Sequence, residues 1–442
     1  MRQGNLSAAG LDIGAHELMA CVPDGDAQQL VRAFGTYTAA LETLADWLVD
    51  RGLQTAAMAS TGVYGLPLFE TLAARGMQCC LRSARAITPG PGRQSAVLDC
   101  QWLHTWHSSG WLQASLRPEA ALVALRPLLR HRAHLLQHRA PHVLHRQTAL
   151  LQMHLPLSQA LSAVMGATGH RIIRAMVAGA RAPRPLAALR HYRCQKDGDE
   201  SARALTGTWR AEPLFVLQQA RALCDCYTAP LSACDAQIER AFSVMKPRCD
   251  PAPDEPWPAR PTTPPRTPPS HSQNAPASNT RAHLRRIPGV DWVAVHGIST
   301  AIAQTMLSAL GTEMSKWPDE QHCWAWLGLA PNNAISGGKG LQSRTMQTRH
   351  RAAHAFRMAA QSVLRADGAL GALDRRLQGR LGPAHALVAT AHQMARTVSH
   401  MRKERVPSHD SGAAAYHKRF RERALKSLQK KAAQLGYTLA PV

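Results

Sequence analysis

The sequence has few acidic residues, no long apolar run and no signal for secretion. Its 442 residues contain 29 Asp and Glu against 52 Lys and Arg, which gives a formal net charge of +23. No apolar run reaches the roughly 18 residues that a membrane-spanning helix requires. The first residues also lack the apolar core of a signal peptide. These absences argue against a membrane or secreted protein, and we expect a cytoplasmic one.

The cysteines lack the spacing of a metal site. The closest groupings among the ten are Cys79-Cys80 and Cys224-Asp225-Cys226, and no C-x-x-C pair occurs. This excludes a zinc finger or zinc ribbon. We therefore expect reduced, mostly buried thiols.

The excess of basic residues is the strongest feature of the composition. A net charge of +23 favours a polyanionic partner, and nucleic acid is the usual one. The alternative is a ribosome-like protein or the arginine bias of a GC-rich genome. Such a bias alone would raise the number of acidic residues as well.

The first 115 residues show alternating strand and helix patterns, which favour an α/β sheet. The patterns predict strands or hairpins at 10–22, 30–34, 54–58 and 78–81, with helices at 38–51 and 66–75. Asp12 lies on the first strand, where the leading acid of a ribonuclease-H-like metal site is expected. A turn aspartate before Gly14 is the alternative. Asp99 is expected to open a helix, and an N-cap is its alternative role.

Residues 119 to about 240 predict an antiparallel helical arm. Leucines recur at helical spacing, and a second long helix is expected from 213 to 245. Arg130 and Arg132 belong to a basic stripe that we interpret as reading a nucleic-acid backbone, with a solvated face as the alternative. We expect Pro141 to kink the first arm helix. Eleven of the thirty residues 247–276 are proline, which predicts an extended linker.

The C-terminal region contains a short motif, Ser336-Gly337-Gly338-Lys339. A hydroxyl nucleophile, two residues without side chains and a cation would let a phosphate approach the backbone closely. The alternative is a glycine turn with a solvated lysine. The stretch 284–302 resembles a helix-hairpin-helix clamp, and 416–435 predicts a strongly basic amphipathic helix.

Four blocks of sequence, in order, resemble the signature blocks of DEDD insertion-sequence transposases, the IS110 (one-ten) family. The blocks are Gly10–Gly14, Met58–Gly65, Gly92–Trp102 and Gly328–Lys339. Shorter matches at 164–169, 174–179 and 390–396 extend the resemblance over nearly the whole chain. Members of this family are bacterial recombinases guided by a bridge RNA.

The resemblance implies a RuvC-like domain with four acids that bind Mg²⁺ and a transposase domain whose serine forms a covalent phosphoserine link with DNA. By position, Asp12 corresponds to the first acid, Asp99 to the fourth and Ser336 to the nucleophile. It also implies dimers or tetramers that hold donor and target DNA with a guide RNA, in the nucleoid. The implied domains are a RuvC-like nuclease domain, a helical arm, a disordered linker and a transposase domain, at 1–118, 119–246, 247–282 and 283–442.

The chain departs from the family pattern at two of the four acids. Ala59 stands where the family has glutamate, and Ala96 where it has the third acid. We therefore expect weakened or absent Mg²⁺ binding and slow or absent cleavage. Nucleic-acid binding is expected to survive, because it is spread over many cations. The residues assigned to it are Lys339, Arg344, Arg349, Arg351, Arg130 and Arg132.

Two functional readings follow. The first is a transposase that is impaired in cleavage through decay of a mobile element. The alternative is a non-catalytic DNA- and RNA-binding regulator that keeps the scaffold. An unrelated basic structural protein would require the ordered blocks to be coincidence.

Overall fold

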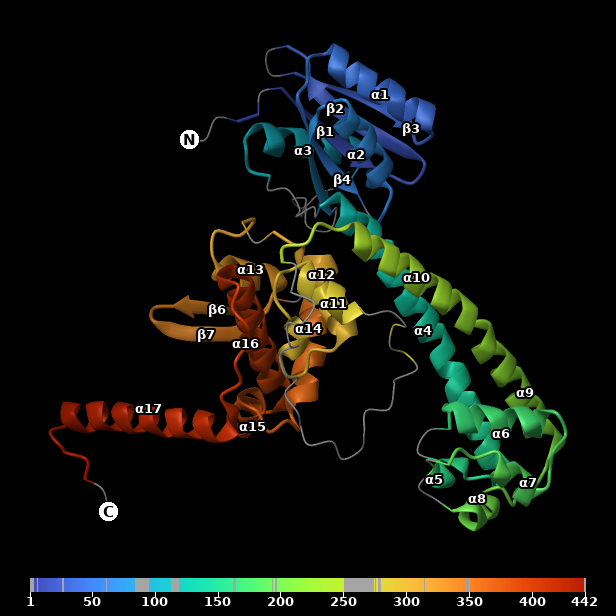
Figure 1. Cartoon of the computed structure of the whole chain (residues 1–442). Coiled ribbons are helices and arrows are strands. Elements are labelled where there is room, and N and C mark those ends of the chain that lie inside the picture. Colours follow the sequence, from blue (N-terminus) through green and yellow to red (C-terminus); the bar gives the residue numbers. More distant parts are fainter. Residues whose placement is uncertain are drawn as a thin grey trace. The chain divides into compact units, whose positions relative to one another are not determined.

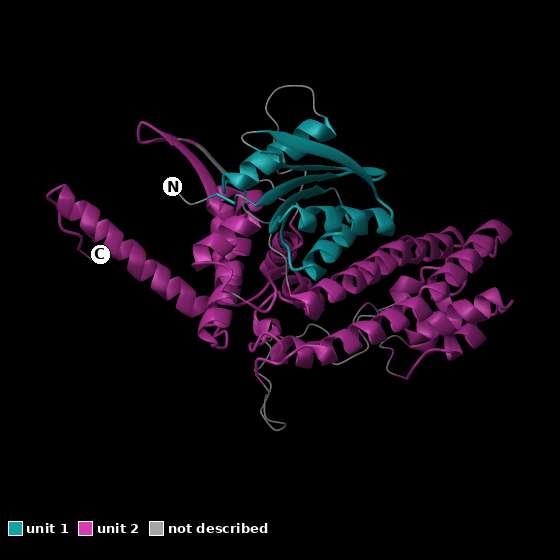
Figure 2. Ribbon diagram, turned by 90° about the horizontal axis from the view of Figure 1, so that it is seen from above, with its two compact units in different colours: residues 1–117 teal, residues 118–442 magenta. Residues whose placement is uncertain are grey.

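The computed structural model divides into two compact units, Met1–Arg117 and Pro118–Val442, which Figure 2 shows in different colours. Each unit is described by itself. The described residues are 4–5, 7–25, 28–60, 62–83, 95–112, 119–161, 164–192, 194, 197–249, 274, 276, 280–313, 315–346, 348 and 350–440. Most of the proline-rich segment therefore lies outside the described residues.

The first unit is built on a five-stranded sheet (Figure 1). The strand order is β3-β2-β1-β4-β5, in which β1 pairs antiparallel with β2 and parallel with β4. The strands are β1 (Ala8–Ile13), β2 (Glu17–Pro23), β3 (Gln29–Gly35), β4 (Thr55–Ser60) and β5 (Gln78–Ser83). The predicted α/β sheet is confirmed, and the predicted segment 10–22 forms the β1–β2 hairpin.

Helices cover both faces of this sheet, as the alternation of side chains along β1 requires. Ala9, Leu11 and Ile13 pack into a core with the leucines of α1 (Thr38–Asp50) and α2 (Gly65–Ala74). Gly10 faces α3 (Ala96–Ser108) on the other side. A Cβ atom at Gly10 would lie 2.2 Å from the backbone oxygen of Cys100, so the glycine lets α3 approach β1 closely.

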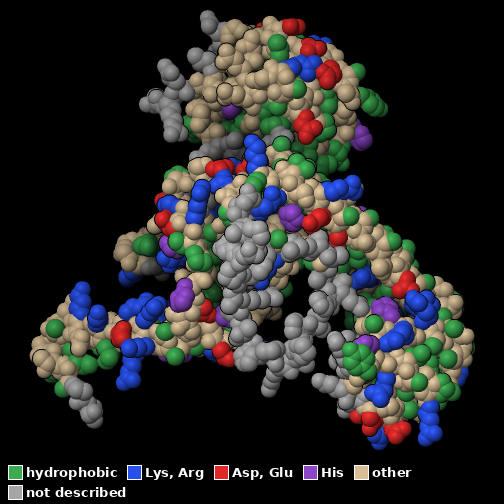
Figure 3. All heavy atoms as spheres, in the orientation of Figure 1, with side chains coloured by type: hydrophobic (Ala, Val, Ile, Leu, Met, Phe, Trp, Pro, Cys, Tyr) green, Lys and Arg blue, Asp and Glu red, His purple; other side chains and the backbone are tan. Residues whose placement is uncertain are grey.

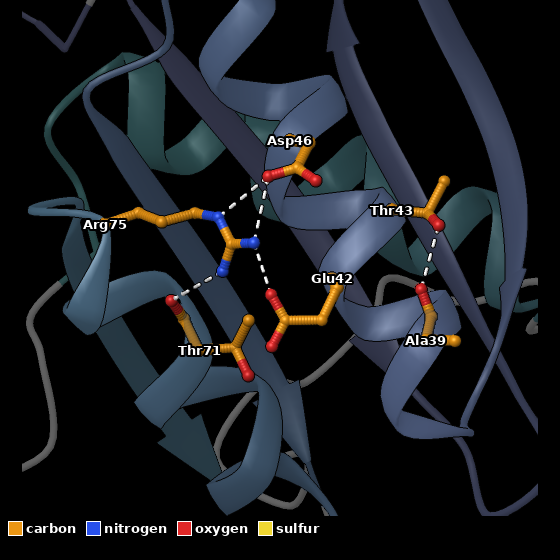
Figure 4. A network of polar contacts seen from close by, with 6 residues as sticks. All are labelled: Ala39, Glu42, Thr43, Asp46, Thr71 and Arg75. Atoms are coloured by element: carbon orange, nitrogen blue, oxygen red, sulfur yellow. Dashed lines mark hydrogen bonds and ion pairs between the residues drawn. The ribbon is translucent and has the colours of Figure 1, made fainter.

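An arginine at the end of α2 links the two helices on the first face (Figure 4). Arg75 Nε donates to Asp46 Oδ1 at 2.9 Å, and its guanidinium is also ion-paired with Glu42 on α1. Arg75 Nη1 donates back to the carbonyl of Thr71 at 3.4 Å. These contacts hold the C-terminal end of α2 against α1.

The second unit begins with the predicted helical arm. Helix α4 (Ala120–Gln152) packs against α9 (Ala211–Cys226) and α10 (Thr228–Val244). The single helix expected at 213–245 is therefore two helices that meet at Tyr227. Helix α4 continues as one helix through Pro127 and Pro141, both exposed. Four short helices share a second core with the far end of α4: α5 (Leu157–Ala160), α6 (Ala167–Val177), α7 (Pro183–Ala188) and α8 (Gly198–Ala204).

The C-terminal helices and the near end of the arm share one hydrophobic core. Leu122 of α4 and Phe242 of α10 are buried in it with Trp292 and Phe356. The elements of this region are α11 (Thr280–Arg286), the 3-10 helix η2 (Trp292–Ala294), α12 (Thr300–Leu310), α13 (Glu320–Leu327), β6 (Pro331–Ser336), β7 (Lys339–Thr345), α14 (Arg351–Val363), α15 (Ala369–Leu381), α16 (Pro383–Glu404) and α17 (Gly412–Gln434). The predicted helical C-terminal region is confirmed.

The segment that resembles a helix-hairpin-helix clamp runs from α11 to α12. The carbonyl of Gly297, at the second turn, accepts a hydrogen bond from Ser362 Oγ of α14 at 3.1 Å. Ser299 is the N-cap of α12, and its side chain accepts from the backbone N–H of Ile302. This second turn is therefore packed against α14.

Most of the cysteine side chains are buried, as the sequence predicts. All ten cysteines lie in the described ranges, and six of them are buried. Among the helices of the described residues, none is both long and apolar enough to cross a membrane.

Candidate functional site

The structure brings Asp12 and Asp99 together in the first unit. Asp12 lies on β1 and Asp99 in the first turn of α3, and both side chains are half-buried. Burial, followed by the negative charge of Asp99, raises the pKa of Asp12 above its ordinary value, while a hydrogen bond from the backbone of Ile13 opposes this. Two carboxylates held close together in a partly buried place repel each other, and a bound cation would relieve that repulsion.

The sheet register places three residues in a row across β1, β4 and β5. Asp12 is the register partner of Ala59, and Ala59 is the register partner of Arg82. Partners in neighbouring parallel strands present their side chains on the same face, here the face that α3 covers. Ala59 is buried, so its methyl group lies beside Asp12 at the position where the resemblance led us to expect a carboxylate.

Arg82 was not identified from the sequence. It lies on the α3 face of β5 at the end of an apolar strand, as Cys80 does two residues earlier. The signal that could have identified Arg82 is its position directly after the predicted strand 78–81. Its cationic group belongs to the same row as Asp12.

The first turn of α3 carries the other two positions. Ser95 is the N-cap, and its hydroxyl accepts from the backbone N–H of Leu98 at 3.2 Å. The alternative role of Asp99 as N-cap is therefore wrong. Ala96 is the first residue of α3 and lies three residues before Asp99, which makes them neighbours on one face of the helix.

The carboxylates present do not fit a pair of metal ions. A two-metal nuclease site holds its ions about 4 Å apart and needs several acids to neutralise them. Within the described ranges, no group of three or more His, Cys, Asp and Glu side chains is placed to hold a metal. Asp12 and Asp99 remain, and Ala59 and Ala96 supply no ligand.

Ser336 ends the first strand of an exposed hairpin in the second unit. β6 and β7 pair antiparallel, and Ser336 is the register partner of Lys339 across the turn. Gly337 and Gly338 form this turn with φ of 56° and 74°. Positive φ at both central residues is the signature of a type I′ hairpin, which explains the two glycines. Ser336 and Lys339 are exposed and lie on the same face of the hairpin.

The base of this hairpin is fixed although its end is exposed. Helix α13 ends at Gly328, whose left-handed φ is 67°, and Thr348 Oγ1 donates to the carbonyl of Leu327 at 3.2 Å. The rings of Trp326 and His350 meet with centroids 4.1 Å apart. Burial, and secondly the charge of Arg126, lower the pKa of His350 to about 4. The neutral His350 side chain caps α14 by accepting from the N–H of Ala352 at 3.2 Å.

Two of the predicted nucleic-acid-binding arginines are neighbours. Arg130 of α4 and Arg351 at the start of α14 are both exposed. Burial, and secondly the charge of Arg351, lower the pKa of Arg130. The side chain of Arg344 and the whole of Arg349 lie outside the described residues.

The prediction for Arg132 is wrong. Its guanidinium is buried and forms an ion pair with Asp235 of α10, with Nη2 donating to Asp235 Oδ2 at 3.3 Å. Nη2 also donates to the carbonyl of Asn274 at 3.0 Å. This arginine joins two arm helices and is not available to a phosphate.

Two protein-family models match the chain. A DEDD transposase model of IS110 elements matches residues 9–156, which include both aspartates and the two alanines. A model described as the IS116/IS110/IS902 transposase family matches residues 293–373, which include the serine hairpin. No curated protein matches the chain. The chain belongs to the IS110 family of transposases.

Proposed function

We propose that this transposase keeps the DNA-joining scaffold of its family but is impaired in strand cleavage. The pairing of Asp12 with Ala59 carries this proposal, because it puts a methyl group in the position of a metal-binding carboxylate. Ala96 removes a second carboxylate beside Asp99. In the proposed division, the nuclease domain ends near 118 and the transposase domain begins near 283.

The chemistry that we assign to Ser336 is a transesterification. Its Oγ attacks the phosphorus of a DNA phosphodiester, the bond to one deoxyribose oxygen breaks, and the serine proton leaves as that oxygen gains one. The number of phosphoester bonds is conserved, so the covalent link can be rejoined to a second strand. The glycine turn lets the backbone approach the phosphate, and the Lys339 ammonium stabilises the charge that builds on its oxygens.

Divalent metal ions are generally used by DEDD transposases, and in such sites they neutralise the scissile phosphate. Mg²⁺ is the ion that we propose for a complete site. Since two alanines occupy the proposed ligand positions, we expect this chain to bind Mg²⁺ weakly or not at all. The four positions 12, 59, 96 and 99 would form the site only if carboxylates were restored at two of them.

DNA and a guide RNA are the proposed partners, in a homo-oligomer within the nucleoid. The exposed pair Arg130 and Arg351, together with Lys339, supports binding of a phosphate backbone, which requires none of the metal ligands. The same observation favours a second candidate function. A protein that binds DNA and RNA without cutting would regulate an active relative.

Restoring the two carboxylates distinguishes the recombinase function from the regulator function. The Ala59→Glu/Ala96→Asp protein is incubated with Mg²⁺, element-end DNA and the non-coding RNA next to the element. Return of strand exchange would identify a recombinase that lacks only ligands. If the doubly restored protein binds DNA and RNA but exchanges no strands, the regulator is the better account.

A further inference from the structure

The helix α17 (Gly412–Gln434) contains no buried residue over its 23 residues. In Figures 1 and 2 its second half runs away from α15, and no other described helix of the second unit lies beside that half in either view. Helices in proteins gain most of their stability from packing of an apolar face, and α17 buries none of its residues. Its exposed surface is therefore open to a partner.

The first turns of α17 are held in place. The Arg376 guanidinium of α15 lies 4.1 Å from the ring centroid of Phe420 and 5.6 Å from that of Tyr416. Asp410 accepts from the backbone N–H of Gly412 at 2.9 Å and from that of Ala369 at 3.0 Å. These contacts fix the direction of the helix, while its remaining turns stay exposed.

The charge on α17 is almost entirely positive. Its sequence contains seven Lys and Arg and a single acid, Glu422. Arg419, Arg423, Lys426 and Lys430 follow each other at intervals of four, three and four residues, which places them on one face of the helix. Figure 3 shows Lys and Arg side chains gathered along this helix, at the lower left of the view. We call these four residues the cationic stripe.

The cationic stripe leads toward the body of the second unit. Arg423 and Arg376 line a groove between α15 and α17 together with Gln393 of α16. Gln393 also lines a neighbouring groove that contains Arg396, and the Arg396 guanidinium lies 5.0 Å from the ring centroid of Trp324. Positive groups thus continue from the exposed helix onto α16.

We propose that α17 lies in the major groove of duplex DNA and that the cationic stripe contacts its phosphates. This inference rests on the proposed action on DNA. The stripe spans about 16 Å, at a rise of about 1.5 Å per residue. Duplex DNA presents one charge per about 1.7 Å of its axis, so the stripe faces the phosphates of about five base pairs.

Two other occupants fit less well. A second copy of α17 would use Leu425, Leu428 and Leu435, which are exposed at heptad spacing. That seam covers fewer than two heptads, and pairing would bring two clusters of seven basic residues together. An RNA duplex is disfavoured because its major groove is too narrow for a helix about 10–12 Å wide, whereas that of B-DNA is about 12 Å wide.

The test compares two triple variants of the full-length chain that remove the same charge from the same helix. The first is Arg423→Gln/Lys426→Gln/Lys430→Gln, on the cationic stripe. The matched control is Lys418→Gln/Arg421→Gln/Lys431→Gln, off the stripe. Binding to a fluorescent 30-base-pair DNA is measured as a function of salt by anisotropy, in a Ser336→Ala background so that no covalent link contributes. Circular dichroism checks that helix content is equal.

The stripe variant is expected to make the negative slope of log K for DNA association against log salt smaller in magnitude by about 2.7. The control is expected to change that slope by less than about 1. Equal slopes in the two variants would overturn the inference and leave the serine chemistry intact. An equal or larger effect on an RNA duplex would also overturn it. So would loss of self-association in the stripe variant with an unchanged DNA slope, since that assigns the helix to a second copy. Absence of DNA binding by the Ser336→Ala protein itself would reject both this inference and the proposed function.

Discussion

Asp12 on β1 and Ala59 on β4 are register partners, so a methyl group lies beside a half-buried carboxylate whose pKa is already raised. The partner of Ala59 on the other side is Arg82, a cation. The row across the sheet therefore offers one negative and one positive group where a metal site needs several acids. We propose that carboxylates at positions 59 and 96 are what this chain lacks for a metal site.

Restoring the two acids is expected to create metal-dependent stability. Without metal, the Ala59→Glu/Ala96→Asp protein should unfold at a lower temperature than the unaltered protein, because added carboxylates repel Asp12 and Asp99. Saturating Mg²⁺ or Mn²⁺ should then raise the unfolding temperature, with about 2.7 kcal/mol of stabilisation at a hundredfold excess over Kd. Thermal unfolding with and without metal measures this.

The matched control for this prediction is Ala59→Gln/Ala96→Asn. These side chains have the same size but carry no charge, so no metal-dependent rise is expected. An equal rise in both proteins would show that the effect has another origin than the four positions.

Arg130 and Arg132 are two residues apart on α4 and should behave in opposite ways. Arg132→Ala leaves Asp235 buried without its partner and should lower the free energy of unfolding by about 3–5 kcal/mol. Arg130→Ala removes an exposed charge and should leave stability unchanged while reducing the salt dependence of DNA binding. Urea unfolding and DNA anisotropy on both variants measure the difference. Equal stability of the two would contradict the burial of Arg132.

The serine hairpin should depend on its two glycines. In the Ala59→Glu/Ala96→Asp background, Gly337→Ala/Gly338→Ala should reduce covalent DNA attachment strongly, because each left-handed alanine costs about 1–2 kcal/mol and the turn loses its shape. The unfolding temperature of the core should hardly change, because every residue of β6 is exposed and the hairpin can open locally to release this strain. Gly379→Ala, in open space on α15, is the control and should leave attachment unchanged. Full attachment by the turn variant would show that Ser336 acts without this geometry.

The base of the hairpin should weaken in acid through His350. Because the folded state holds its pKa near 4 against an ordinary 6.5, the unfolded chain binds the extra proton as pH falls. The contribution of neutral His350 to the free energy of unfolding is fully present above about pH 6.5. It is lost as the pH falls from 6.5 to about 4, and the total loss is about 3 kcal/mol.

His350→Asn keeps a capping side chain but cannot titrate, so the stability of this variant should fall less over that range. His354→Asn, one turn later and exposed, is the control and should follow the unaltered protein. The measurement is the unfolding temperature from pH 7 to pH 4. Identical curves for the two variants would show that His350 does not cause the loss of stability in acid.

Much of the first unit could be predicted from the sequence, since its strands and helices carry clear apolar periods. That Asp12 and Asp99 lie close together was expected only from the family resemblance. The hairpin β6–β7 could not be predicted, because every residue of β6 is exposed and no apolar alternation marks it. The helices α5, α7 and α8 have only four, six and seven residues, which is too few to show a helical period. Arg132 was misassigned because its partner, Asp235, is 103 residues away along the chain.

The most direct test of the central claim is covalent attachment of DNA to the unaltered chain. The purified protein is incubated with Mg²⁺, end-labelled element DNA and the adjacent non-coding RNA, and adducts are resolved on a denaturing gel beside the Ser336→Ala variant. We expect the unaltered protein to form no adduct above the Ser336→Ala background. A magnesium-dependent adduct that requires Ser336 would show that two carboxylates suffice and would contradict the claim that Ala59 and Ala96 disable cleavage.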